Sequence, residues 1–191
     1  QVSEFKLFHL CVEETLICNL EFEKLLIFIR KLILFKIKTL NFSKSLVKLM
    51  TTISLNSFLN EYFWEVSKNE LNDISMIENR IFESVELNIP INEADYLCLA
   101  MYKPLFKYDF KSKIPFNDST IKLYEYTIDN MIVEKNIIKN IVSFCDVKDK
   151  TSIKVQNQYE HYPYPRWIYS DTYLLKTNMI IVSNIIPATN C

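Results

Sequence analysis

The residues whose chemistry is least generic lie between positions 153 and 167, in the run IKVQNQYEHYPYPRW. Aromatic rings alternate there with prolines and charged side chains. Proline fixes its own φ and moves the preceding residue toward extended values, so Tyr162 to Pro165 is expected to be an extended strap. A pre-ordered strap loses little entropy on docking and presents its rings to opposite sides. Arg166, next to Trp167, can clamp a carboxylate through two hydrogen bonds.

Two interpretations of the strap follow from these residue types. It either seals one hydrophobic layer against another, with Arg166 paired to Glu160 or to a helix end, or it docks on a partner. A general-base role for His161 is disfavoured, because no nucleophile stands next to it in the sequence.

The run from Gln158 to Trp167 resembles the Q-Y-E-x-x-P-Y-P-R-W motif of a bacterial family of S-adenosylmethionine-dependent methyltransferases, whose members often carry tetratricopeptide repeats. Three upstream places are similar to further motifs of that family, in the family's order. They are Glu23 to Leu34 (E-x-L-L-x-x-x-R-x-x-L-L), Phe58 to Tyr62 (F-x-N-E-Y) and Ala100 to Leu105 (A-x-Y-x-P-L).

The resemblance implies an N-terminal accessory, substrate-side region of such an enzyme. The family's glycine-rich cofactor loop follows the motif and is missing here, so the chain is expected to be a fragment that binds no S-adenosylmethionine by itself and is inactive alone. Its partner would be its own downstream methyltransferase domain; the methyl acceptor is unknown, and no catalytic or metal-binding residue is assigned. The implied substrate-binding or interdomain residues are Tyr159, Glu160, Tyr164, Arg166 and Trp167. The alternative is a helical protein-interaction module without catalytic activity.

Glycine is the most informative count, because the 191 residues contain none. At an average usage of roughly 7 %, about thirteen would be expected. Every glycine-dependent phosphate loop and the nucleophile elbow are therefore excluded. Lys and Arg number 22 against 23 Asp and Glu, a net charge of −1 that argues against a nucleic-acid partner. The composition, 49 % hydrophobic and 24 % charged, is that of a globular protein.

The five cysteines are odd in number and form no C-x-x-C pair. Cys11 and Cys18 would lie about 10 Å apart on one helix face, too far for a disulfide. Free thiols in a reducing cytoplasm are the favoured interpretation. His9 lies near these two cysteines, but the spacing matches no zinc pattern.

The segment from Leu25 to Leu40 is the most apolar long run, yet four basic residues interrupt it, so no membrane span is expected. Lys24, Lys31 and Lys38 recur every seven residues and line one edge of a helix. This pattern favours a helix that faces the core on most sides and has a solvated lysine edge. A basic helix lying on a membrane surface is the alternative.

The fold class expected is mostly α: an irregular multi-helix domain over residues 1–150, followed by the aromatic-proline strap and a C-terminal tail over 151–191. Asn92 and either Asp118 or Ser119 are expected to cap helices. Glu61 is expected inside the third helix as a solvated or capping carboxylate. The expected helices cover about 7–17, 21–39, 45–67, 69–86, 93–103 and 119–140, with a polar-aromatic loop over 107–116.

Overall fold

The computed structural model describes residues 5–15, 19–37, 39, 42–141 and 149–161. These residues form helices and short helical turns and contain no strand, which confirms the mostly α fold. The α-helices are α1 (Lys6–Glu14), α2 (Leu20–Lys36), α3 (Lys44–Leu59), α4 (Lys68–Glu86), α5 (Glu93–Ala100), α6 (Ile121–Tyr124), α7 (Asn130–Ile138) and α8 (Lys150–His161).

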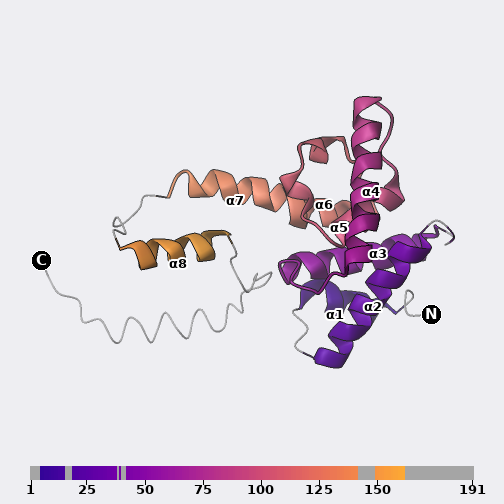
Figure 1. Ribbon diagram of the computed structural model, residues 1–191, viewed down its shortest axis with the longest axis horizontal. Coiled ribbons are helices and arrows are strands. Elements are labelled where there is room, and N and C mark those ends of the chain that lie inside the picture. The colour runs from indigo at the N-terminus through magenta and orange to yellow at the C-terminus, as the bar shows by residue number, and fades with distance from the viewer. Residues whose placement is uncertain (1–4, 16–18, 38, 40–41, 142–148, 162–191) are drawn as a thin grey trace, which may run out of the picture.

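Helix α3 lies at the centre of the molecule (Figure 1) and contacts α1, α2, α5, α6 and the helical turn that follows α6. Every residue from Met50 to Leu59 is buried, so this helix has no solvent face there. Many of these residues are small and polar, and Ser54 satisfies its hydroxyl by donating to the carbonyl of Met50 one turn earlier. Small side chains let the surrounding helices approach α3 closely.

Side-chain caps begin five of the described helices, as the sequence predicts for Asn92. Its side-chain oxygen accepts from the backbone N–H of Ala94. Helix α4 begins with a complete capping box, in which Ser67 and Glu70 satisfy each other's backbone N–H groups. The prediction of Asp118 or Ser119 as a cap is wrong: Thr120 precedes α6, and its hydroxyl accepts from the N–H of Asn117 instead.

The ends of α3 and α4 show how a chain without glycine terminates a helix. Beyond α3, Glu61 and Tyr62 have φ values of 56° and 58°, and beyond α4 Asn88 has 55°. In both places paired backbone hydrogen bonds close a Schellman motif, with Tyr62 N–H donating to Ser57 and Ile89 N–H to Ser84. The expected helix over 45–67 therefore ends at Leu59, and Glu61 lies beyond it rather than inside.

Residues 105–113 form two short 3₁₀ helices, η2 (Leu105–Lys107) and η3 (Asp109–Lys113), in place of the expected loop. Helix α6 continues through a π-helical turn, η4 (Glu125–Asp129), into α7. Figure 1 shows α7 projecting from the helical body. Most side chains of α7 are exposed, including Ile132, Ile137 and Ile138.

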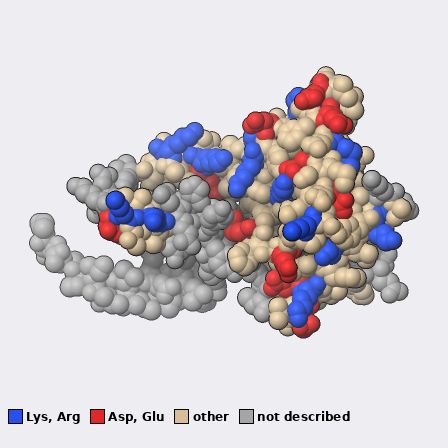
Figure 2. Space-filling model, viewed as in Figure 1, with Lys and Arg blue, Asp and Glu red and all other residues tan. Residues whose placement is uncertain are grey.

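Two expectations about particular segments need correction. Helix α2 faces the core on one side only, and its opposite face exposes large apolar side chains. Residues 153–161, the first part of the aromatic run, belong to α8, whereas Tyr162 to Pro165, expected to be extended, lie outside the described residues. On the face shown in Figure 2, positive and negative side chains are interspersed.

Candidate functional site

The structure describes only part of the site predicted from the sequence. Tyr159 and Glu160 lie in the last turn of α8. Tyr164, Arg166 and Trp167 lie outside the described residues. The two clusters of charged side chains described below lie in the helical body, and the sequence predicted neither.

The first cluster surrounds Arg30, whose side chain is fully buried. Its guanidinium carbon lies 4.2 Å from the ring centroid of Tyr102 and 5.3 Å from that of Trp64, so two aromatic rings cover the cation. One nitrogen donates to the carbonyl oxygen of Glu65 at 2.7 Å. Burial lowers the pKa of Arg30 from its ordinary value, and the nearby carboxylate of Glu70 opposes this shift.

Glu70 supplies the balancing charge from the first turn of α4. Its carboxylate lies 3.8 Å from Arg30 and 3.2 Å from Lys31, and it accepts a hydrogen bond from the hydroxyl of Tyr102 at 2.9 Å. Burial alone would raise the pKa of Glu70, but the hydrogen bonds from Ser67, Tyr102 and Lys31 together lower it. The cluster thus joins α2, α4 and the end of α5 through one buried ion pair.

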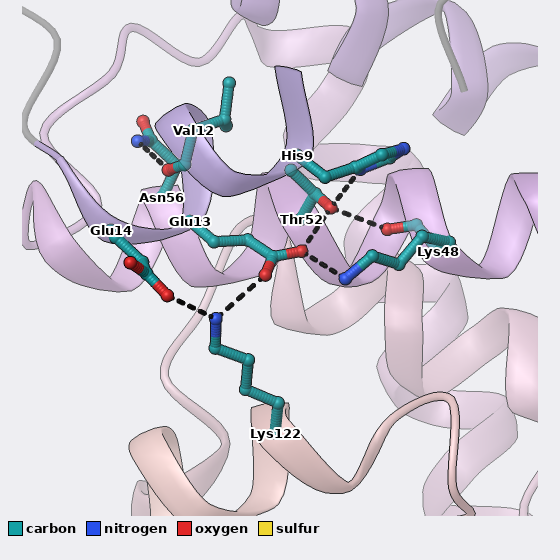
Figure 3. A network of polar contacts seen from close by, with 8 residues as sticks. All are labelled: His9, Val12, Glu13, Glu14, Lys48, Thr52, Asn56 and Lys122. Atoms are coloured by element: carbon teal, nitrogen blue, oxygen red, sulfur yellow. Dashed lines mark hydrogen bonds and ion pairs between the residues drawn. The ribbon is translucent and has the colours of Figure 1, made fainter. Parts of the chain in front are cut away.

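The second cluster joins α1, α3 and α6 around the buried Glu13 (Figure 3). Lys48 and Lys122 donate to the two carboxylate oxygens of Glu13 at 2.5 and 2.9 Å. Thr52 Oγ1 lies 2.7 Å from the carboxylate and 2.6 Å from Nδ1 of His9.

The charges of this second cluster stabilise one another. Burial would raise the pKa of Glu13, but the hydrogen bonds from Lys48, Lys122 and Thr52 together hold it below its ordinary value of 4.5. Burial would lower the pKa of Lys122, but Glu13 and Glu14 together raise it above 10.5. Glu13 and Lys122 are therefore both charged near neutral pH.

The order His9, Thr52, Glu13 brings an imidazole, a hydroxyl and a carboxylate together, as nucleophilic catalysis would require. The geometry does not support that chemistry. Thr52 is fully buried, so no substrate reaches its hydroxyl, and this hydroxyl lies within hydrogen-bonding distance of the Glu13 carboxylate and the Lys48 carbonyl. What the arrangement can do is hold three helices in register.

A surface cavity of about 140 Å³ lies between α2 and α4. Its lining combines apolar side chains with one acid and one base: Leu34, Phe35, Ile37, Asp73, Met76, Ile77 and Arg80. The guanidinium of Arg80 is already held by Asp95 through two hydrogen bonds, and this pairing is the main reason that its pKa is raised. The cavity therefore has a mixed lining, in which apolar side chains lie beside the polar groups of Asp73 and Arg80.

The described cysteines differ in environment, and we expect them to differ in reactivity. Burial raises the pKa of the Cys98 thiol to about 12, whereas Cys11 is exposed. The thiolate is the reactive form, so maleimide should label Cys11 in the native protein and leave Cys98 unmodified until denaturant is added. Peptide mass spectrometry after brief labelling checks this. Equal labelling of the two thiols before unfolding would contradict the burial of α5.

No family model matches the chain, and no curated protein or solved structure shows significant similarity to it. None of the described helices combines the length and hydropathy that a membrane crossing requires. Within the described ranges, no group of three or more His, Cys, Asp or Glu side chains is placed to hold a metal ion.

Proposed function

We propose that this chain is the helical accessory, substrate-side domain of an S-adenosylmethionine-dependent methyltransferase. The observation that carries the proposal is the order of the four family-like motifs along the chain, ending in the run from Gln158 to Trp167. Each of the three upstream motifs has low specificity for the family when taken alone. Their occurrence in the same order as in the family is what supports the proposal.

The fold adds a second argument, because the first and third upstream motifs meet in the Arg30 cluster. Arg30 comes from the first motif and Tyr102 from the third, and the two side chains stack. The second motif covers the last two residues of α3 and the turn after them, and Trp64 and Glu65, both of which Arg30 contacts, follow it in the chain. A shared structural role explains why these residue types would occur together in one helical domain.

The residues present do not fit the cofactor. A chain without glycine cannot form the G-x-G-x-G turn, where the backbone approaches a nucleotide closely. S-adenosylmethionine, which supplies the methyl group, would be held by another part of the polypeptide. The contribution of this domain would be to orient the acceptor and exclude water, which is what methyl transfer needs most.

The exposed apolar side chains of α7 support a contact with a further domain. Ile132, Val133, Ile137 and Ile138 are 42–64 % exposed. Four large apolar residues on one projecting helix are more than a solvated helix needs, and a neighbouring domain would cover them. The residues expected to act on the acceptor or at this interface remain Tyr159, Glu160, Tyr164, Arg166 and Trp167.

The test uses the complete natural gene product. We expect it to bind S-adenosylmethionine in calorimetric titration. We expect Arg166→Ala and Trp167→Ala to lower its turnover about a hundredfold through misplacement of the acceptor, with cofactor affinity unchanged. Phe63→Ala is the control, because Phe63 is 91 % exposed and lies far from the motif in sequence.

Two results would overturn the proposal. One is a complete gene product that binds no S-adenosylmethionine. The other is an active enzyme in which both variants lose stability alone, with turnover per folded molecule unchanged.

A helical protein-interaction module is the second candidate function. The exposed outer face of α2 favours it, and that face is independent of the methyltransferase proposal.

A further inference from the structure

Helix α2 has two apolar faces, and the core covers only one of them. The inner face buries Leu26, Arg30, Ile33 and Leu34. The outer face exposes four large apolar side chains, Leu25, Phe28, Leu32 and Phe35, at 44 %, 60 %, 45 % and 47 %. We call these four residues the α2 seam.

The spacing of the α2 seam is that of a helix-pairing surface. Its members follow one another at intervals of three, four and three residues, which are the a and d positions of a heptad pattern. The seam extends about 15 Å along the helix. A stripe only two positions wide per heptad fits the side chains of one partner helix.

We propose that the α2 seam binds an amphipathic helix of another protein, one whose apolar stripe is flanked by acidic side chains. The basic side chains on both sides of the seam favour a partner with acidic side chains. Lys24 and Lys31 lie on one side of it and Lys36 on the other, in the positions that face a partner's flanking residues. Among the described residues, Lys24 pairs with the exposed Glu21, and Glu70, which Lys31 approaches, is also balanced by Arg30. Lys31 and Lys36 therefore leave an excess of positive charge beside the seam.

The same lysines argue against a second copy of this chain as the occupant. In an antiparallel pair of α2 helices, the Lys24 and Lys31 side of one helix lies beside the same side of the other. In a parallel pair, Lys31 of one copy lies beside Lys36 of the other. Both arrangements place like charges together at the edge of the seam, which disfavours them.

A lipid surface fits less well than a helix. A helix lying in a membrane interface needs a wide apolar face, whereas the seam is narrow because the other side of α2 is fixed to the core.

The cavity between α2 and α4 gives the docked helix an anchor. Phe35, the last residue of the seam, also lines this cavity, together with Met76 and Ile77 of α4. A large apolar side chain of the partner can enter there, and buried anchors of this kind carry most of the energy of small interfaces. Two heptads of contact correspond to a transient interface, so we expect a micromolar dissociation constant.

Synthetic helices test the proposal directly on this chain. One peptide of about three heptads carries Leu at its a and d positions and Glu at the flanks, and its matched counterpart carries Lys at the flanks. We expect the Glu-flanked peptide to bind about tenfold or more tightly than the Lys-flanked one at low salt, with the difference shrinking as salt is added. Fluorescence anisotropy of labelled peptides measures both affinities.

Variants of the seam locate the binding. Phe28→Ser with Leu32→Ser should weaken the Glu-flanked peptide about tenfold or more, while Phe63→Ser, a matched exposed aromatic outside α2, should change nothing. Lys24→Glu with Lys36→Glu should transfer the preference to the Lys-flanked peptide. All of these side chains are exposed, so the fold should tolerate the changes, and circular dichroism verifies that it does.

Three results would overturn the proposal. The first is equal affinity for the two peptides, or affinity that the seam variants leave unchanged. The second is a dimer in sedimentation that the seam variants convert to monomer, which would make a second copy the occupant. The third is seam-dependent binding to phosphatidylserine vesicles without peptide binding, which would make the occupant a membrane.

Discussion

Replacing Arg30 by methionine is expected to lower the free energy of unfolding by about 3–5 kcal/mol, the usual cost of removing one partner of a buried ion pair. Methionine keeps much of the apolar volume but leaves Glu70 with less compensating charge in a buried site. It also removes the cation that Tyr102 and Trp64 cover. Urea unfolding followed by circular dichroism measures the change.

Arg80→Met is the matched control for this loss. Arg80 also pairs with a carboxylate, that of Asp95, but its side chain is 41 % exposed and that of Arg30 is fully buried. Water can solvate Asp95 when Arg80 is removed. Arg80→Met should therefore lower the free energy of unfolding by about 1 kcal/mol or less. Equal costs for the two variants would mean that the Arg30 cluster adds nothing beyond a surface ion pair.

Two further variants separate the contribution of the ion pair to stability from the contribution of side-chain packing. Arg30→Met combined with Glu70→Gln removes both charges, so the double variant should lose less than the sum of the two single losses. Arg30→Lys keeps the charge but loses the flat guanidinium that stacks on Tyr102, and it should fall between wild type and Arg30→Met.

The beginnings of the helices could be predicted from the sequence better than their ends. Asn92 caps α5 as predicted, because a capping amide followed by acidic residues is a local signal. The end of α3 at Leu59 was missed, because the usual signal for a left-handed residue after a helix is glycine. Here Glu61 and Asn88 take the left-handed conformation, which paired backbone hydrogen bonds hold in place. The amino-acid sequence carries no signal for these hydrogen bonds.

The two charged clusters could not be predicted, because their members are distant in sequence. Arg30 and Tyr102, or Glu13 and Lys122, meet only once the helices have packed. One signal was available. Arg30 is one of only three arginines and stands in a largely apolar stretch, where a cation needs a buried partner if its side of the helix is the core.

The two faces of α2 illustrate a different limit of prediction from hydrophobic patterns. Apolar residues surround this helix almost completely, and such a pattern normally predicts burial on most sides. The pattern cannot tell a core face from a docking face, since both are apolar at helical spacing. Only the packing of α3 and α4 against one side shows that Leu25, Phe28, Leu32 and Phe35 belong to the other.

The Glu13 cluster gives the largest expected dependence of stability on pH. Glu13→Gln should cost about 2–3 kcal/mol at neutral pH, somewhat less than a fully buried pair, because Lys48 and Lys122 are partly exposed and can turn toward water. The folded state holds the pKa of Glu13 below its ordinary value of 4.5. The stabilisation is therefore complete above pH 4.5 and is lost as the pH falls through the lower, folded-state pKa.

Wild type should thus lose stability steadily as acid is added below pH 4.5, and Glu13→Gln should lose less over the same range, because it no longer carries this titrating group. The Glu13→Gln profile keeps some slope, since the pKa of Glu70 is lowered in the same way. Glu21→Gln is the control, because Glu21 is 80 % exposed and pairs with Lys24 three residues further along the helix surface. Urea midpoints measured between neutral pH and mild acid give all three profiles. Parallel profiles for wild type and Glu13→Gln would show that the carboxylate joining α1, α3 and α6 contributes nothing to the acid sensitivity of the fold.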